Sequence, residues 1–263
     1  MSEKVNPLLE GINNIPGETF RLPSGGLFYT DGEFDESVKD GEVHVYPMKT
    51  VDELIMKSPD KILTGKAIEE VFSRCIPDIK KPEQLLAADV DYLLAAIRVV
   101  SYGDDAEVTT THTCEDAKEQ TYVVNIRDIL REGRELDPTS LDKNYKMKLE
   151  GYTISIRPPK FSSVIKLYQV ISEEFLKNAD EEEVAGKMIQ NLSDMIAEVN
   201  GTNDPEFILE WLTNIKAGWV NKISDFTRKT SNWGIEYTRE VECKDCKKKF
   251  EISVPTNPIT FFT

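Results

Sequence analysis

Residues 238–254 read Thr-Arg-Glu-Val-Glu-Cys-Lys-Asp-Cys-Lys-Lys-Lys-Phe-Glu-Ile-Ser-Val, and the interpretation of the fold starts from this stretch. It places Cys243-Lys244-Asp245-Cys246 between two extended segments, 234–241 and 250–254. A C-x-x-C pair in a tight turn between strands aims two thiolates at one ion, as a zinc knuckle does. Because two thiolates fill only half of a tetrahedral site, we expect further ligands from a second turn elsewhere in the chain.

Cys114 occupies a second turn of this kind. Segments 106–112 and 120–125 flank it and are rich in β-branched and aromatic side chains, as strands are. A matching C-x-x-C pair would place its second sulfur at position 117, where the chain has Ala117. We therefore expect two hairpins that lie together, with residues 125–233 inserted between them.

The two turns together predict one zinc ion bound by soft ligands. Its thiolates would come from Cys114, Cys243 and Cys246, and its fourth ligand from His112, from Asp116 or from water. The alternative interpretation is that the three cysteines are surface thiols of a knuckle that has lost its ion.

The rest of the chain predicts an α+β fold. Segment 42–47 alternates polar and apolar residues as a half-buried strand does, and short amphipathic helices follow it. Segments 145–149 and 152–156 flank Glu150-Gly151 and predict a second hairpin. Apolar residues three and four positions apart predict three long helices over 162–178, 181–199 and 205–229.

These elements define the expected architecture. A helical cluster and a three-helix insertion surround a small antiparallel sheet, with a split and degenerate zinc-ribbon-like pair of hairpins. Residues 1–105 form an N-terminal loop, strand and short-helix region, and residues 106–131 form the first knuckle hairpin. Residues 143–233 hold a hairpin and a helical bundle, and residues 234–263 hold the second knuckle hairpin and the C-terminal tail.

Composition limits the functions that the chain can perform. Its 263 residues include 40% hydrophobic and 30% charged side chains, enough for at least one full core. Acidic residues outnumber basic ones by 47 to 32, so the formal charge of -15 repels the phosphates of nucleic acid. Lys247-Lys248-Lys249 is the one basic run, and we interpret it as a solvated turn. We expect no membrane span, no export signal and a reducing compartment.

No arrangement of residues typical of an enzyme occurs in the sequence. His44 and His112 are the only histidines, and neither stands in a recognisable catalytic motif. Thr64-Gly65-Lys66-Ala67 lacks the upstream glycine and the Ser or Thr of a phosphate-binding loop. We therefore expect a non-catalytic protein that binds its partners through a few aromatic side chains rather than through charge.

One predicted partner-binding segment is the loop 23–29, which reads Pro-Ser-Gly-Gly-Leu-Phe-Tyr. Its glycines permit unusual backbone angles, and Leu27, Phe28 and Tyr29 supply apolar surface for a partner. The competing interpretation is that Phe28 and Tyr29 cover the sheet of their own chain.

A second predicted partner-binding segment is the aromatic pair Phe261 and Phe262 at the C-terminus. Chain ends usually fray, so such a pair either binds a partner or folds back onto the core. We favour folding back. Trp211, Trp219 and Trp233 lie in or just after the last long helix and are interpreted as core residues.

A series of short motifs follows in a defined order along nearly the whole chain. In that order the motifs are Leu22-Pro23-Ser24-Gly25-Gly26, Val45-Tyr46-Pro47-Met48-Lys49-Thr50-Val51-Asp52-Glu53, Leu63-Thr64-Gly65-Lys66-Ala67-Ile68, Arg98-Val99-Val100-Ser101-Tyr102-Gly103, Cys114, Ile156-Arg157-Pro158-Pro159, Cys243-Lys244-Asp245-Cys246 and Phe261-Phe262. This ordered set, rather than any one motif, resembles the baseplate hub assembly proteins of T-even-type contractile-tailed phages.

The resemblance implies a protein that builds the central hub of the baseplate by binding other hub or tail proteins. It would act in the host cytoplasm, either as an assembly factor absent from the finished particle or as a minor hub subunit retained in the virion. The residues alone also leave open a rival class, a zinc-ribbon protein associated with nucleic acid or transcription. Retention on DNA that depends on salt would separate the two classes.

Overall fold

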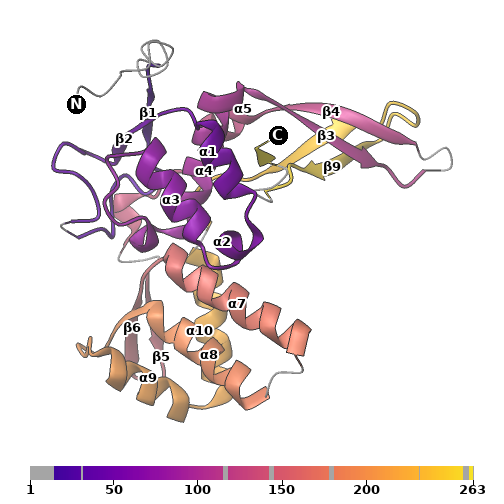
Figure 1. Ribbon diagram of the computed structural model, residues 1–263. Coiled ribbons are helices and arrows are strands. Elements are labelled where there is room, and N and C mark those ends of the chain that lie inside the picture. The colour runs from indigo at the N-terminus through magenta and orange to yellow at the C-terminus, as the bar shows by residue number, and fades with distance from the viewer. Residues whose placement is uncertain are drawn as a thin grey trace, which may run out of the picture.

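The computed structural model describes residues 15–30, 32–114, 118–141, 145–177, 181–230, 232–256 and 261–262. It is a mixed α+β structure with two hydrophobic cores and a projecting arm of two hairpins (Figure 1). The first core is built mainly from the N-terminal half and also includes Phe161, Ile252, Val254, Phe261 and Phe262. The second core is built from the segment between the two hairpins of the arm. The predicted fold class is therefore confirmed.

Helices build most of the first core. The helices are α1 (Thr50–Met56), α2 (Pro59–Leu63), α3 (Lys66–Cys75) and α4 (Ala87–Tyr102), with a 3-10 turn at Pro82–Gln84. Helix α3 buries Ile68, Val71, Phe72 and Cys75, which share one face because they are three and four positions apart. Helix α4 is buried around most of its circumference, so it forms the centre of this core.

A short antiparallel pair completes the first core. Strand β1 (Glu18–Arg21) pairs with β2 (Glu42–Val45), the strand predicted from alternation. Val43 and Val45 face inward and are fully buried, while Glu42 and His44, which alternate with them, are exposed. This period of two is what places one face of the strand on α4.

The second core contains a three-stranded sheet covered by helices. Strands β5 (Lys146–Leu149), β6 (Tyr152–Ile156) and β7 (Ile196–Val199) run in the order β5-β6-β7, all antiparallel. The helices of this part are α7 (Phe161–Lys177), α8 (Glu181–Asp194), α9 (Pro205–Asn214) and α10 (Ala217–Thr230). Helix α7 also reaches the first core, where Phe161 is buried and its N–H donates to the carbonyl oxygen of Leu85.

The predicted three-helix insertion needs two corrections. The helix expected over 181–199 ends at Asp194, because Ile196–Val199 is the strand β7 and buries both of its terminal side chains against the sheet. The helix expected over 205–229 is two helices. The chain is extended at Ile215, which packs against the second core, and a new turn begins where the Trp219 N–H donates to the Lys216 carbonyl.

The arm consists of the two hairpins predicted from the cysteine turns (Figure 1). Strands β3 (Asp105–Thr111) and β4 (Glu119–Asn125) form the first, and β8 (Thr238–Glu242) and β9 (Lys249–Ser253) the second. They lie side by side as separate two-stranded sheets, with β3 against β9. The helix α5 (Ile126–Arg131) follows β4 and packs on α4, which fixes the base of the arm.

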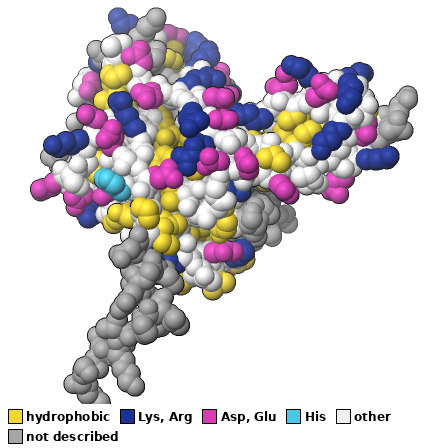
Figure 2. Space-filling model, turned by 90° about the horizontal axis from the view of Figure 1, so that it is seen from above, with side chains coloured by type: hydrophobic (Ala, Val, Ile, Leu, Met, Phe, Trp, Pro, Cys, Tyr) yellow, Lys and Arg dark blue, Asp and Glu magenta, His cyan; other side chains and the backbone are white. Residues whose placement is uncertain are grey.

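Charged side chains of both signs are distributed over the surface, including the arm (Figure 2). None of the helices within the described ranges combines the length and apolarity that crossing a bilayer requires.

Candidate metal centre

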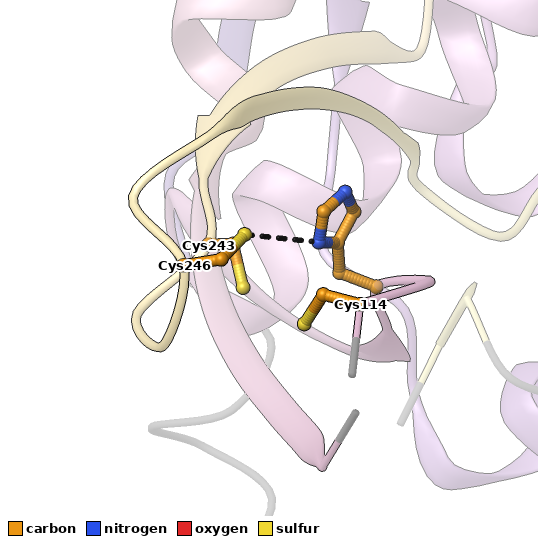
Figure 3. Close-up of side chains that lie close together, drawn as sticks. Cys114, Cys243 and Cys246 are labelled. Carbon is orange, nitrogen blue, oxygen red and sulfur yellow. Dashed lines mark hydrogen bonds between the residues drawn. The ribbon is translucent and has the colours of Figure 1, made fainter. Parts of the chain in front are cut away.

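Three cysteines and one histidine converge where the two hairpins meet. One ligand atom each from His112, Cys114, Cys243 and Cys246 lies within 4.8 Å of all the others. Figure 3 shows Cys114 on one hairpin facing Cys243 and Cys246 on the other. The Nδ1 atom of His112 is 3.4 Å from the sulfur of Cys246. The two turns thus place all four side chains at one point, although more than one hundred residues separate them in the chain.

The turn between β8 and β9 is shaped by its own backbone. The Cys243 N–H donates to the Lys248 carbonyl at 2.9 Å, and the Lys247 N–H donates to the Cys243 carbonyl at 3.0 Å. Lys247 adopts a left-handed conformation, with φ of 59°, which lets the chain reverse directly after the second cysteine. This geometry leaves the N–H groups of Cys246 and Asp245 pointing at the sulfur of Cys243.

Those N–H groups favour a thiolate at Cys243. The N–H of Cys246 first, and then that of Asp245, lower the pKa of this thiol to about 6, against a desolvation effect that raises it. Burial, followed by the neighbouring sulfurs of Cys243 and Cys246, raises the pKa of Cys114. The pKa of Cys114 also rises because a second negative charge beside these sulfurs would be repelled, and a bound cation would remove that repulsion.

The donor set fits zinc. Three thiolates and one imidazole are a ligand combination of structural zinc sites, in which a tetrahedral ion places its ligand atoms roughly 3.5–4 Å apart. The spacing of the cluster is close to that value. All four positions would be filled by protein atoms, so a bound ion would fix the two hairpins to each other and leave no coordination position for a substrate.

Neighbouring side chains hold the ligands in place. The amide nitrogen of Gln120 lies 3.8 Å from the sulfur of Cys243 and donates to Asp245 at 2.5 Å. The carbonyl oxygen of Gln120 accepts from the Lys244 N–H at 2.9 Å. The ring of His112 packs on Phe250 with their centroids 4.5 Å apart. Contacts of this kind orient metal ligands; sequence reasoning missed Gln120, which carries no signal of its own within a strand.

The sequence-predicted metal ligands are therefore brought together, with His112 in the fourth position. Asp116, the other predicted fourth ligand, lies outside the described residues. Cys75 is in the first core, where burial raises the pKa of its thiol to about 12 and keeps it protonated. His44 is not part of the cluster; its Nδ1 atom lies 3.1 Å from Asp78 at the surface.

The loop that contains Leu27, Phe28 and Tyr29 lies elsewhere, between the two cores. Leu27 and Phe28 are half-buried against the second core, and the rings of Phe28 and Tyr145 are 5.0 Å apart. Tyr29 packs on the first core, edge to face with Phe34 at 4.8 Å. These contacts agree with the interpretation that the aromatics cover their own chain, and a role in binding partners remains a prediction.

The carboxylate of Asp89, which sequence reasoning missed, anchors this loop. It is completely buried and accepts from the Ser24 N–H at 3.0 Å and from the Tyr29 hydroxyl at 2.7 Å. The Tyr29 oxygen accepts in turn from the Leu86 N–H at 2.8 Å. An acidic residue in a strongly apolar helix is the signal that could have identified it.

Phe261 and Phe262 fold back onto the first core, as we favoured. They are 4% and 1% exposed, and their rings contact Tyr237 and Tyr102 respectively. Their predicted binding to a partner is a separate matter that this geometry does not test. Because the two rings are buried, a partner would first contact the residues that surround them.

Comparison with known proteins adds one finding. The family model described as T4 bacteriophage base plate protein matches residues 31–263, nearly the whole chain. No curated protein and no solved structure matches.

Proposed function

We propose that this chain, which belongs to the T4 bacteriophage base plate protein family, helps to build the central hub of a phage tail baseplate by binding other tail proteins. The match over residues 31–263 carries the proposal. Family membership gives a structural or assembly role in the baseplate, with other phage tail proteins as partners. The assignment to the central hub goes beyond family membership, and the ordered motifs from Leu22 to Phe262 support it.

The proposed mode of action is binding without catalysis. In the cluster at the arm, one histidine and three cysteines form a closed ligand set. The fourth cysteine of the chain, Cys75, is a protonated residue of the first core. The remaining histidine, His44, is exposed beside Asp78. These placements favour a scaffold whose metal would serve the arm rather than a reaction.

We further propose that the bound metal is zinc. When bound, zinc supplies a structural link and neutralises clustered thiolates. Its role here would be to hold the β3-β4 hairpin against the β8-β9 hairpin, because these two sheets share no strand pairing in the described residues. A rigid arm loses less conformational freedom when it binds a partner, which favours affinity.

Affinity purification from phage-infected cells tests the hub assignment. The full chain carrying a removable tag should recover hub proteins of the baseplate in preference to the proteins of its periphery. A matched preparation with the tag on an unrelated acidic protein controls for charge. Recovery of peripheral baseplate proteins without hub proteins would contradict the hub assignment and leave the family role intact.

Mass spectrometry separates the two forms of the proposal. A minor hub subunit is expected in purified phage particles in a constant ratio to other hub proteins. An assembly factor is expected in the infected-cell lysate and not in the particles. Absence from tail-assembly complexes in the lysate as well would contradict both forms.

The rival function, binding of nucleic acid by a zinc ribbon, has one observation in its favour. The basic run 247–249 lies at the tip of the arm beside the cysteine cluster. However, Lys249 pairs with Glu240 at 2.7 Å, and Lys247 lies 4.0 Å from Glu242. Retention on a DNA column that falls steeply with added salt would support the rival function; we expect no retention at physiological salt.

A further inference from the structure

A small pocket lies at the junction of the two cores, and none of the metal ligands lines it. Three segments line it: the start of α4, the turn after β6 and the connection between α10 and β8. The lining residues are Ala87, Ala88, Asp91, Pro158, Pro159, Trp233 and Ile235. Its volume of about 240 Å³ is below the roughly 300 Å³ at which pockets for small-molecule ligands begin. The pocket therefore has the size of a side chain rather than of a cofactor.

Asp91 is the only charged residue that lines this pocket among the residues that the structure describes. Solvent reaches its side chain, yet the surrounding protein raises the pKa of the carboxyl to about 6 through desolvation. Among the described residues its carboxylate has no hydrogen bond and no ion pair. Tyr237 lies beside it, but its hydroxyl donates to the backbone oxygen of Asp91 at 2.9 Å. A carboxylate in such a recess lacks the cation that would compensate it.

The other walls of the pocket are apolar and held in place. Trp233 packs against the second core, in which the Tyr145 hydroxyl donates to the Thr230 carbonyl at 2.9 Å. Gly234 makes a two-bond bridge with Arg134. The carboxylate attracts a cation, the indole of Trp233 lines the same pocket, and the neighbouring prolines offer apolar surface to an alkyl chain.

We propose that this pocket binds a lysine side chain of a neighbouring baseplate protein. The ammonium group would pair with Asp91 beside the indole of Trp233, while the four-carbon stem would contact the prolines. A compact ammonium on a flexible stem fits a narrow pocket with one carboxylate better than the wide, forked guanidinium of arginine does. The identity of the neighbour rests on the proposed function; the chemistry of the pocket does not.

Asp91 is a suitable position for substitution, because its side chain is exposed and its carboxylate makes no hydrogen bond or ion pair among the described residues. Replacement by asparagine should therefore leave the melting temperature at neutral pH unchanged or raise it, which makes Asp91→Asn a usable variant.

The test uses n-butylammonium, which reproduces the lysine side chain, and the indole N–H signal of Trp233 in the NMR spectrum of the full chain. Trp233→Phe assigns that signal. We expect a saturable shift in the millimolar range, and binding that is about tenfold weaker in Asp91→Asn. The matched control Asp128→Asn changes an exposed carboxylate of α5 and should bind like the wild type.

Two results would overturn the proposal. One is the absence of any saturable shift with n-butylammonium. The other is an equal shift with 1-butanol, which would show that the pocket accepts an alkyl chain regardless of charge. Neither result depends on a partner protein. Failure of hub proteins to co-purify, with normal binding of n-butylammonium, would instead count against the proposed function alone.

Discussion

At the scale of single residues, the cysteines divide into two kinds with different chemistry. Cys75 is enclosed by the first core, and burial keeps its thiol protonated. Cys243 is also buried, but two backbone N–H groups stabilise its thiolate and lower its pKa to about 6. The difference between them is the hydrogen-bond donors at the sulfur rather than exposure, and it is what makes one of them a metal ligand in our account.

We predict that the purified chain contains about one zinc ion and that Cys243→Ser loses most of it. Elemental analysis of protein prepared without chelator measures this directly. Cys75→Ala is the matched control, since it removes a cysteine outside the cluster and should keep its zinc. Wild-type protein with much less than one zinc per chain would contradict the site, as would equal zinc loss in both variants.

Asp89 gives a second prediction at the residue scale. Burial raises the pKa of its carboxyl to about 6, opposed by bonds from Ser24 and Tyr29. The folded chain therefore keeps a proton that the unfolded chain releases near pH 4, and stability falls as pH rises from about 4 through about 6. Above that range Asp89 lowers the free energy of unfolding by about 2–3 kcal/mol relative to low pH.

Urea denaturation of wild type and Asp89→Asn measures this effect, because asparagine cannot titrate. The stability advantage of the wild type over the variant should shrink by about 2–3 kcal/mol between about pH 4 and about pH 7. Other carboxylates affect both proteins equally and cancel. An advantage that stays constant with pH would show that Asp89 has an ordinary pKa.

At the scale of elements, the loop 23–29 is held from both sides. Tyr29 is fixed to α4 through Asp89, while Phe28 packs on Tyr145 next to the second core. Phe28 has a φ of 66°, an unusual conformation for a residue with a bulky side chain. The surrounding contacts must overcome that strain, so the loop acts as a link between the two cores.

We predict that Phe28→Ala lowers the free energy of unfolding by about 1.5–2.5 kcal/mol, half the loss for a fully buried phenylalanine. Thermal denaturation measures it, with Val123→Ala on an exposed position of β4 as the control that should change little. An unchanged melting temperature together with weaker co-purification of hub proteins would favour the docking role of this loop instead.

The elements predicted best from sequence were those with a strict local pattern. Alternation and turn residues placed β2 and the pairs β3-β4 and β5-β6, and helical spacing found α3. The short strand β7 could not be found this way, because Ile196–Val199 continues the apolar spacing of α8 and becomes a strand only by pairing with β6. Likewise, the break at Ile215 depends on packing in the second core.

The metal cluster was only partly predictable, because one half of it follows a local pattern and the other half depends on the fold. The spacing of Cys243 and Cys246 is local and carries its own meaning, whereas the position of Cys114 and His112 opposite them depends on how the hairpins lie together. The sequence could not distinguish Asp91 from Asp89, since both are acidic residues near the start of the same apolar helix and only the fold decides which of them is buried. The environment of Asp91 arises from α4, the turn after β6 and Trp233, which only the folded chain brings together.

At the scale of the whole molecule, the chain consists of two cores and a projecting arm of two hairpins (Figure 1). The ordered motifs predicted a baseplate protein family, and the match over residues 31–263 confirms that family. With a formal charge of -15, the chain would attract the basic side chains of its partners. The pocket at Asp91 and the arm are the two places where the account expects contact.

The most direct test of the central claim asks whether hubs form without this chain. Tail structures from cells infected with phage that lacks the chain are separated by sedimentation and examined by electron microscopy, with the chain supplied from a plasmid as the control. The account predicts baseplate parts without an assembled hub, and complete tails when the chain is restored. Normal numbers of complete tails in its absence would contradict the proposed function.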